Sequence, residues 1–359
     1  MKNFICYFLF IGLFFLSTTP AAFAQQNARQ YGIKIGVMKP GELNAITDVG
    51  GVKVGQITLI KKDNIRTGVT AILPHGGNIF QQKVPAAVYV GNGFGKLTAT
   101  TQIEELGTIE TPIILTNTLS VPTAANAVLT YVLSKNANRK IRSINPVVGE
   151  TNDGYLNAIR KRFVREEHVL NAIKKAGGGK VKQGNVGAGT GTTALGFKGG
   201  IGTSSRVLPD KLGGYTVGVL AQTNFGGSLR IDGIPVGEIL NEKKMSSRIK
   251  RPEGSCMIVV ATDAPLNARN LKRLAKRAML GFGRAGGISS NGSGDYVLAF
   301  STANALRYPY HSDASTRDIT ILRNAVMTPL FRAVIEATEE AIVNSLFHAE
   351  TMTGRNKHT

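Results

Sequence analysis

Short apolar runs recur along the chain, and most of them are flanked by Gly, Asn, Asp or Pro. From Asn44 the sequence becomes Gly-rich and alternates apolar with polar positions, a pattern typical of a β-hairpin. The later runs are too short for ordinary helices, and their flanking turn residues favour buried strands. These predicted strands are residues 86–91, 112–117, 216–221, 256–262 and 296–302.

Helical periodicity occupies the stretches between and after these strands. The predicted helices are residues 122–136, 155–175, 266–280 and 318–348, the last beginning with an acidic first turn. Residues 177–200 and 240–254 are predicted to be loops, and loops of this length are uncommon unless they bind something or are cut. Strands come in clusters without strict βαβ alternation, so the pattern predicts an α+β fold built as a layered α/β/β/α sandwich.

The first 24 residues have the pattern of an export signal. Lys2 precedes an apolar run over residues 4–16, and the stretch ends in Ala-Phe-Ala, which signal peptidase accepts. The apolar run is too short to span a bilayer comfortably, although a retained N-terminal anchor is the alternative. We expect cleavage after Ala24 and a periplasmic or secreted protein without stable membrane insertion.

Composition narrows the classes of protein that fit. The 359 residues are 42% hydrophobic and 18% charged, an ordinary globular mix that excludes collagen-like, disordered and disulfide-scaffold chains. The net charge of +20 favours anionic surfaces, so a non-catalytic, basic envelope-binding protein is one alternative. No DNA-reading module and no Trp occur, so we expect no nucleic-acid partner.

Most familiar catalytic motifs are missing from the sequence. It contains no G-x-S-x-G, no H-E-x-x-H and no Walker A motif, and its five histidines lack ligand spacing. We therefore expect no metal and no organic cofactor. Removal of the signal would also take Cys6 and leave Cys256 as the only cysteine, so no intrachain disulfide is expected.

One hydroxyl-based arrangement remains at the Gly254-Ser255 step, between a basic loop and a predicted buried strand. Glycine permits the strained backbone that lets a following serine Oγ attack the preceding carbonyl. Such an N→O acyl shift, followed by hydrolysis, would leave Ser255 as a new N-terminus whose free amine could act as its base. A simple turn is the alternative interpretation of a Gly-Ser step before a strand.

Several longer motifs give this step a wider context. In chain order they are NAITDVGGVKVG at 44–55, PVVGETNDG at 146–154, GNVGAGTGT at 184–192, AQTNFG at 221–226, TDAP at 262–265 and NGSGDY at 291–296. Together they resemble the DmpA-type aminopeptidases, a serine peptidase family with an N-terminal-nucleophile-like fold of the DmpA/ArgJ type. The resemblance extends from about residue 44 to residue 355.

The resemblance implies that the chain cuts itself between Gly254 and Ser255. The products would be an α chain of residues 25–254 and a β chain of residues 255–359, which together form one catalytic domain. The implied enzyme is a serine aminopeptidase or amidase that releases N-terminal residues from small peptides, amides or esters. It also implies that αβ heterodimers assemble into a homo-oligomer.

The resemblance further implies roles for individual residues. Ser255 would be the nucleophile, Ser293 would hydrogen-bond the nucleophile or its amine, and Asp295 would orient Ser293. Asn224 would donate to the oxyanion of the attacked carbonyl. Without the family pattern, a turn, cap or strand-edge role would suit Asn224 and Asp295 as well.

Substrate recognition follows the same resemblance. Glu150 would bind the protonated amine of the substrate, which would explain a preference for free N-termini. Asn152 stands where some relatives carry a tyrosine that assists the oxyanion hole, and Tyr155 is a weaker substitute. We expect Cys256 to be inert core packing. An acyltransferase and an ω-amino-acid oligomer hydrolase of the same fold are alternative activities.

Overall fold

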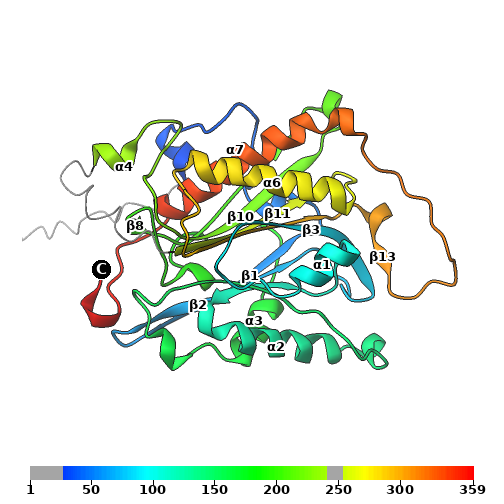
Figure 1. Ribbon diagram of the computed structural model, residues 1–359, viewed down its shortest axis with the longest axis horizontal. Helices are drawn as coiled ribbons and strands as arrows, with labels where there is room; N and C mark the ends of the chain where they lie inside the picture. Colours follow the sequence, from blue (N-terminus) through cyan, green and yellow to red (C-terminus); the bar gives the residue numbers. More distant parts are fainter. Residues whose placement is uncertain (1–26, 241–253) are drawn as a thin grey trace, which may run out of the picture.

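The computed structural model describes residues 27–240 and 254–359 and is built around two stacked sheets (Figure 1). The smaller sheet has the strand order β1-β2-β5-β6, with a β1–β2 hairpin and a parallel β5–β6 pair. Its strands are β1 (Lys53–Lys61), β2 (Ile65–Leu73), β5 (Ile113–Asn117) and β6 (Val147–Thr151).

The larger sheet has the order β13-β3-β12-β11-β10-β9, and its central pair β11–β12 is parallel while the other pairs are antiparallel. Short β4 (Thr108–Ile109) pairs with β3, and β7 (Thr193–Ala194) pairs with β8 (Phe197–Lys198). The main strands are β3 (Gln82–Gly93), β9 (Ile201–Val207), β10 (Thr216–Asn224), β11 (Gly254–Thr262), β12 (Ser293–Ser301) and β13 (Tyr308–Pro309).

Helices cover the outer face of each sheet (Figure 1). Helices α6 (Ala268–Arg284) and α7 (Thr328–Phe347) pack on the larger sheet, and α2 (Val121–Leu133) and α3 (Glu166–Lys174) pack on the smaller one. The predicted α/β/β/α sandwich is therefore confirmed. The described residues also include two short helices, α1 (Thr100–Leu106), whose Ile103 packs into the core between the sheets, and α4 (Val236–Ile239). Within the described residues, no helix has the length and apolar composition needed to cross a membrane.

Three apolar cores separate the four layers, and they explain the continuous apolar runs of the sequence. Along β11, Ile258 and Val260 face the helices α6 and α7, whereas Met257 and Val259 face the smaller sheet. A central strand that is buried on both faces needs apolar residues at every position. The predicted strands at 86–91, 112–117, 216–221, 256–262 and 296–302 accordingly fall within β3, β5, β10, β11 and β12, apart from single residues at their ends.

The long predicted helix at 155–175 is wrong in its first half, because only Glu166–Lys174 is α-helical. The residues before it form turns, including the 3₁₀ turn Ile159–Lys161, and they also bond to distant parts of the molecule. The carbonyl of Leu156 accepts from the amide of Arg355 at 2.7 Å, and the side chain of Asn157 accepts from the amide of Arg66 at 3.2 Å. Helical periodicity cannot reveal such long-range competition.

The prediction at 318–348 starts too early, since α7 begins at Thr328 with Pro329 in its first turn, where the missing N–H costs nothing. The hairpin also begins later than predicted: its strands are β1 and β2, preceded by a 3₁₀ turn at Ile46–Asp48. The predicted loop at 177–200 contains the 3₁₀ turn Gly187–Gly189 and the β7–β8 hairpin. Most of the second predicted loop, residues 241–253, lies outside the described residues.

Candidate active site

Ser255 is the second residue of β11, at the head of a central strand of the larger sheet. The register places Asn224 of β10 opposite Ser255 on one side and Gly294 of β12 beside it on the other. The Ser255 side chain is buried, and its Oγ accepts a hydrogen bond from the backbone N–H of Gly294 at 3.1 Å. Hydrogen-bonded strands on both sides therefore fix the position of this hydroxyl group.

The Gly254–Ser255 step has a backbone that only glycine tolerates. Gly254 has φ +152°, outside the region that L side chains normally adopt. A Cβ atom at this position would lie 2.1 Å from the carbonyl oxygen of Asn224 and 2.6 Å from Cα of Phe225. The glycine expected from the sequence is thus required by both conformation and space.

Ser293 and Asp295 form a buried pair at the start of β12. Ser293 Oγ donates to Asp295 Oδ1 at 2.7 Å, and Ser293 is the parallel-strand partner of Gly254. Burial raises the pKa of Asp295, and the hydrogen bond from Ser293 partly opposes this effect. Asp295 therefore reaches Ser293 directly, whereas among the described residues Ser255 Oγ is bonded to the amide of Gly294.

Asn224 presents its amide nitrogen to the site. Its Oδ1 accepts a hydrogen bond from the backbone N–H of Thr193 at 3.1 Å. A backbone N–H only donates, so the atom that faces it is the carbonyl oxygen, and Nδ2 is the free end of the amide. This nitrogen has no hydrogen-bond partner among the described residues, so it is available to a ligand.

Glu150 comes from β6 of the smaller sheet and is only 3% exposed. Its carboxylate accepts hydrogen bonds from Thr118 Oγ1 and from the backbone N–H of Lys96 at 3.1 Å, and Lys96 Nζ lies 3.7 Å away. Burial raises the pKa of Glu150, while the hydrogen bond from Thr118 and the charge of Lys96 lower it. The site thus combines a buried anion from one sheet with a hydroxyl group from the other.

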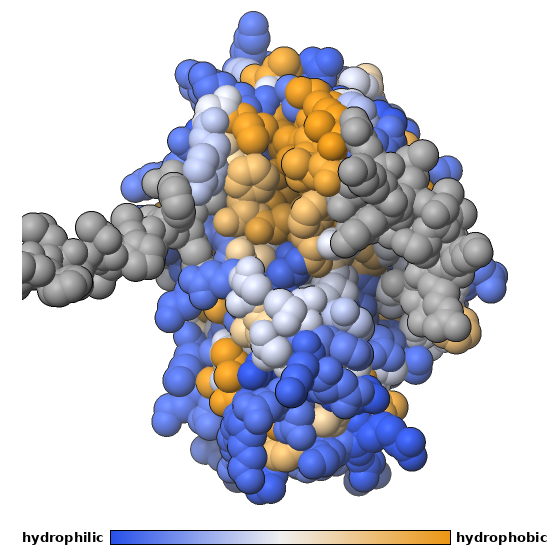
Figure 2. Space-filling model, turned by 90° about the vertical axis from the view of Figure 1, so that its left-hand side faces the viewer, coloured by the Kyte–Doolittle hydropathy of each residue, from blue (hydrophilic) through white to orange (hydrophobic). Residues whose placement is uncertain are grey.

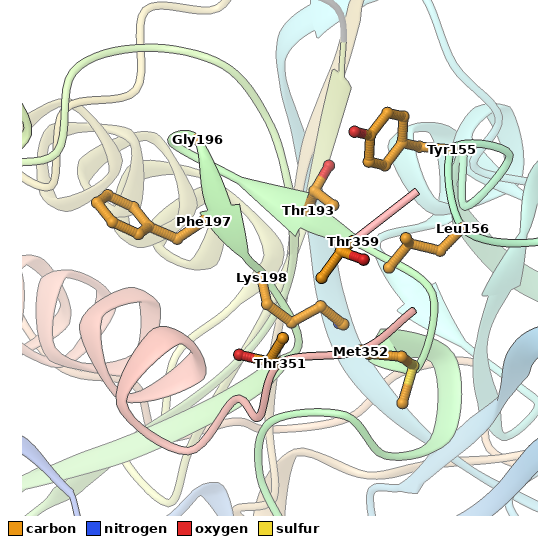
Figure 3. Close-up of a pocket in the computed structure, with 9 residues that line it drawn as sticks. All are labelled: Tyr155, Leu156, Thr193, Gly196, Phe197, Lys198, Thr351, Met352 and Thr359. Carbon is orange, nitrogen blue, oxygen red and sulfur yellow. The ribbon is translucent and has the colours of Figure 1, made fainter. Parts of the chain in front are cut away.

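Glu150, Asn224 and Ser255 line one cavity of about 670 Å³, whereas the buried Ser293 and Asp295 do not line it. Its lining includes Phe94, Lys96, Thr118, Glu150, Asn152, Tyr155, Thr193, Asn224, Gly254, Ser255 and Arg355. A second cavity of about 380 Å³ adjoins it and shares Tyr155 and Thr193 (Figure 3). The structure therefore brings the predicted residues Glu150, Asn152, Asn224 and Ser255 to the same space.

Asn152 and Tyr155 lie at the outer wall of the cavity and are both exposed. Asn152 Oδ1 accepts from the backbone N–H of Gly154 at 2.9 Å, a side-chain turn. The ring of Tyr155 stacks on His358 with 4.4 Å between centroids. Within the described part of the chain, neither side chain hydrogen-bonds Ser255.

Sequence reasoning missed several residues that line the cavity, among them Phe94, Lys96, Thr118, Thr193 and Arg355. Thr118 had a usable signal, because it follows a predicted strand whose end meets that of the parallel strand β6. Arg355 had none, since it reaches the cavity through a hydrogen bond from Nη1 to the carbonyl of Gly154. Cys256 lies in the core, and burial raises its pKa well above the ordinary value, so the thiol stays protonated.

The four-layer fold and this site define a hydrolase with an N-terminal-nucleophile type of architecture. Residues 44–359 match the model of Peptidase family S58. The chain belongs to this family, and it is an aminopeptidase. Family membership favours the enzyme over the envelope-binding alternative.

Known relatives agree with this assignment. A beta-peptidyl aminopeptidase of Sphingosinicella microcystinivorans is 43% identical over 360 residues, which cover 92% of this chain and 88% of the relative. A solved structure from Pyrococcus horikoshii OT3 is 50% identical, with a TM-score of 0.86 and 93% and 94% of the two chains covered. The L-aminopeptidase D-Ala-esterase/amidase of Ochrobactrum anthropi, described as a variant of the Ntn hydrolase fold, is 38% identical with a TM-score of 0.84, covering 92% and 93%.

Proposed function

We propose that this aminopeptidase cuts its own chain between Gly254 and Ser255 and then uses Ser255 as the nucleophile for its substrates. The observation that carries the proposal is the backbone of Gly254, with φ +152° directly before a buried serine. Strain at a single peptide step favours the rearrangement that relieves it.

Self-cleavage would proceed in two steps, an N→O acyl shift and the hydrolysis of the resulting ester. Ser255 Oγ attacks the carbonyl carbon of Gly254, the C–N bond breaks, and the nitrogen takes up the proton, leaving an ester and a free amine. Water then hydrolyses the ester to a Gly254 carboxylate and restores the Ser255 hydroxyl. The chains 25–254 and 255–359 would stay together, because β11 is hydrogen-bonded to β10 of the first chain.

Substrate hydrolysis would use the same atoms. Ser255 Oγ attacks the carbonyl of the substrate's first residue, and its proton passes to the departing amine through a base such as the new N-terminal amine. Asn224 Nδ2 would donate to the oxyanion, and Ser293, held by Asp295, would hydrogen-bond the nucleophile or its amine. Water then releases the first residue from its ester with Ser255.

The proposed substrates are short peptides, amides and esters that carry a free N-terminal amine. Glu150 supports this choice, because a buried carboxylate on the cavity wall pairs with an ammonium group and rejects a blocked, neutral amine. The names of the relatives extend the range: one is a beta-peptidyl aminopeptidase and another an L-aminopeptidase and D-Ala-esterase/amidase. We therefore include β-amino acid residues among the candidate first residues.

The decisive test is intact mass with N-terminal sequencing, comparing wild type with Ser255→Ala. We expect two wild-type chains, one beginning Ser-Cys-Met, and a single uncut variant that does not hydrolyse amino-acid p-nitroanilides. Ser134→Ala, at an exposed position after α2, is the matched control and should be cut like wild type. A single uncut wild-type chain would refute the proposal.

We also propose export and self-association. Residues 1–24, which carry the signal pattern, lie outside the described residues, and a secreted protein lacking them after expression would support cleavage at Ala24. Figure 2 shows a broad apolar area in the upper part of one end of the molecule. Ile234, Ile239 and Leu240, in and beside α4, are exposed apolar residues. An apolar area of this kind is typical of a contact between subunits, and the native mass in solution tests it.

A further inference from the structure

A lysine ammonium group holds the β7–β8 hairpin together beside the active site. Lys198 Nζ donates to the carbonyl oxygens of Gly189 at 3.1 Å, Thr192 at 2.8 Å and Gly199 at 2.6 Å. An ammonium group has three donors, and all three are used by this one stretch of chain. In Figure 3 the Lys198 side chain extends from β8 into the second cavity, toward Met352.

The same hairpin carries the group that orients Asn224. Thr193 belongs to β7 and directly follows Thr192, whose carbonyl oxygen accepts a hydrogen bond from Lys198. The N–H of Thr193 donates to Asn224 Oδ1 at 3.1 Å. The hairpin is also joined to the end of β10 by a bond from the amide of Leu195 to the carbonyl of Phe225 at 2.7 Å. A shift of the hairpin would therefore move the Thr193 N–H and release the Asn224 amide to rotate.

We propose that Lys198 is a positioning residue for the acyl-transfer step: by holding the carbonyls of Gly189, Thr192 and Gly199, it fixes the Thr193 N–H that turns Asn224 Nδ2 toward the nucleophile. This inference rests on the proposed oxyanion role of Asn224. Lysine suits the task because a compact ammonium group directs three donors from one point, whereas the planar fork of arginine does not. Lys198 itself is not among the residues that line the cavity around Ser255.

The test is a double-mutant cycle on the processed enzyme with an amino-acid p-nitroanilide as substrate. Lys198→Met keeps the length of the side chain and removes the donors, so we expect kcat to fall by about 10- to 100-fold, as for a weakened oxyanion donor. KM should change little, because Glu150 is untouched. In an Asn224→Ala background the same substitution should lower kcat by less than about 2-fold, since coupled residues are not additive.

Lys180→Met, at an exposed position in the same region, is the matched control and should keep wild-type kcat. Independent, multiplying effects of Lys198→Met and Asn224→Ala would overturn the inference. If Lys198→Met does not fold, Lys198→Gln, which keeps one polar donor group, enters the same cycle.

A second measurement separates failure of this inference from failure of the proposed function. Hydrogen exchange of residues 189–199 in the uncut Ser255→Ala protein reports on the hairpin without any activity. We expect at least about 10-fold faster exchange after Lys198→Met, because the hairpin loses three hydrogen bonds. Faster exchange with no effect of Asn224→Ala on kcat would remove the proposed oxyanion role, whereas unchanged exchange would overturn the positioning role itself.

Discussion

At the scale of single residues, the site depends on a charge and a donor that are largely buried but line the cavity. Glu150 is a buried carboxylate with hydrogen bonds from Thr118 and from the backbone N–H of Lys96, and the exposed ammonium group of Lys96 lies 3.7 Å away. Asn224 has its carbonyl end occupied by Thr193, which leaves the donor end free. Both groups are oriented by neighbouring residues that take no part in the proposed reaction.

The first prediction concerns Glu150→Gln and the pH dependence of hydrolysis. In the proposed function, binding of the substrate's ammonium group requires ionised Glu150, and burial raises the pKa of this residue above its usual 4.5. Wild-type kcat/KM should therefore fall as the pH decreases through this raised pKa, at higher pH than an ordinary glutamate would give. In Glu150→Gln the acid limb due to Glu150 should be missing. Near neutral pH, kcat/KM should be about 100-fold lower, because the substrate's ammonium group loses its buried carboxylate partner.

The measurement is kcat/KM for an amino-acid p-nitroanilide between pH 4 and 8. Glu104→Gln is the matched control, because Glu104 forms an exposed ion pair with Lys272 and should leave the profile unchanged. The catalytic base must also be deprotonated, so the acid limb that belongs to the base should persist in both proteins, and only the part due to Glu150 should be lost in Glu150→Gln. A pH profile of Glu150→Gln with the same shape as that of wild type would show that another group binds the amine.

At the scale of elements, α7 is fastened to the larger sheet by buried charges as well as by apolar packing. Arg206 of β9 is fully buried, with Nη2 2.6 Å from Glu340 and Nε 3.3 Å from Glu336 on α7. Glu340 also accepts from Asn44, at 2.6 Å, and from Arg29. Asn44, the first residue of the first family motif, therefore supports the fold and does not line the cavity.

The second prediction tests this buried network with Glu340→Gln. Removing one partner leaves the Arg206 charge in the core with weakened compensation, so the free energy of unfolding should fall by about 3–5 kcal/mol. Denaturant unfolding of the Ser255→Ala protein, which avoids complications from two chains, measures the change. Arg332→Gln removes the exposed Arg332, whose Nε lies 4.0 Å from Glu336, and should change stability by less than about 1 kcal/mol. Equal effects of the two substitutions would contradict the role of burial.

At the scale of the whole molecule, ionisable groups are enclosed between the end of the smaller sheet and the β7–β8 hairpin. Asp153 is 1% exposed and accepts from Asn157 at 2.8 Å, and burial raises its pKa to about 7. Burial lowers the pKa of Lys198 to about 7, and the charge of Asp153 opposes this. Burial therefore destabilises both the ionised form of Asp153 and the protonated form of Lys198.

The third prediction follows from linkage at Asp153. Because its folded-state pKa is raised above 3.8, the protonated form stabilises the fold, and this contribution is lost as the pH rises from about 4 to about 7. Raising the pKa of Asp153 from 3.8 to about 7 corresponds to about 4 kcal/mol of folding free energy. The free energy of unfolding of Asp153→Asn minus that of wild type should therefore increase by a similar amount over this range. A pH series of denaturant unfolding curves measures it, with exposed Asp63→Asn as a control that should give a flat difference. A flat difference for Asp153→Asn would contradict the prediction.

The sequence by itself determined the central strands of the larger sheet and the Gly254-Ser255 step, whereas β6 and β9 were not among the predicted strands. Strands buried on both faces must be apolar throughout, so β10, β11 and β12 could be found from composition and flanking turn residues alone. Glycine before serine was informative because one residue type meets the backbone requirement at that position. Both features depend only on residues that are adjacent in the sequence, so the sequence alone is enough to find them.

Only the tertiary structure decided which distant groups meet. It placed Glu150 of the smaller sheet on the same cavity as Ser255 of the larger one, and it brought Arg355 to the cavity wall. It also ended the helical pattern before residue 166, because Leu156 and Asn157 bond to partners far away in the chain. Periodicity and propensity describe neighbours along the chain, whereas these contacts depend on how whole layers stack, and no local pattern encodes that.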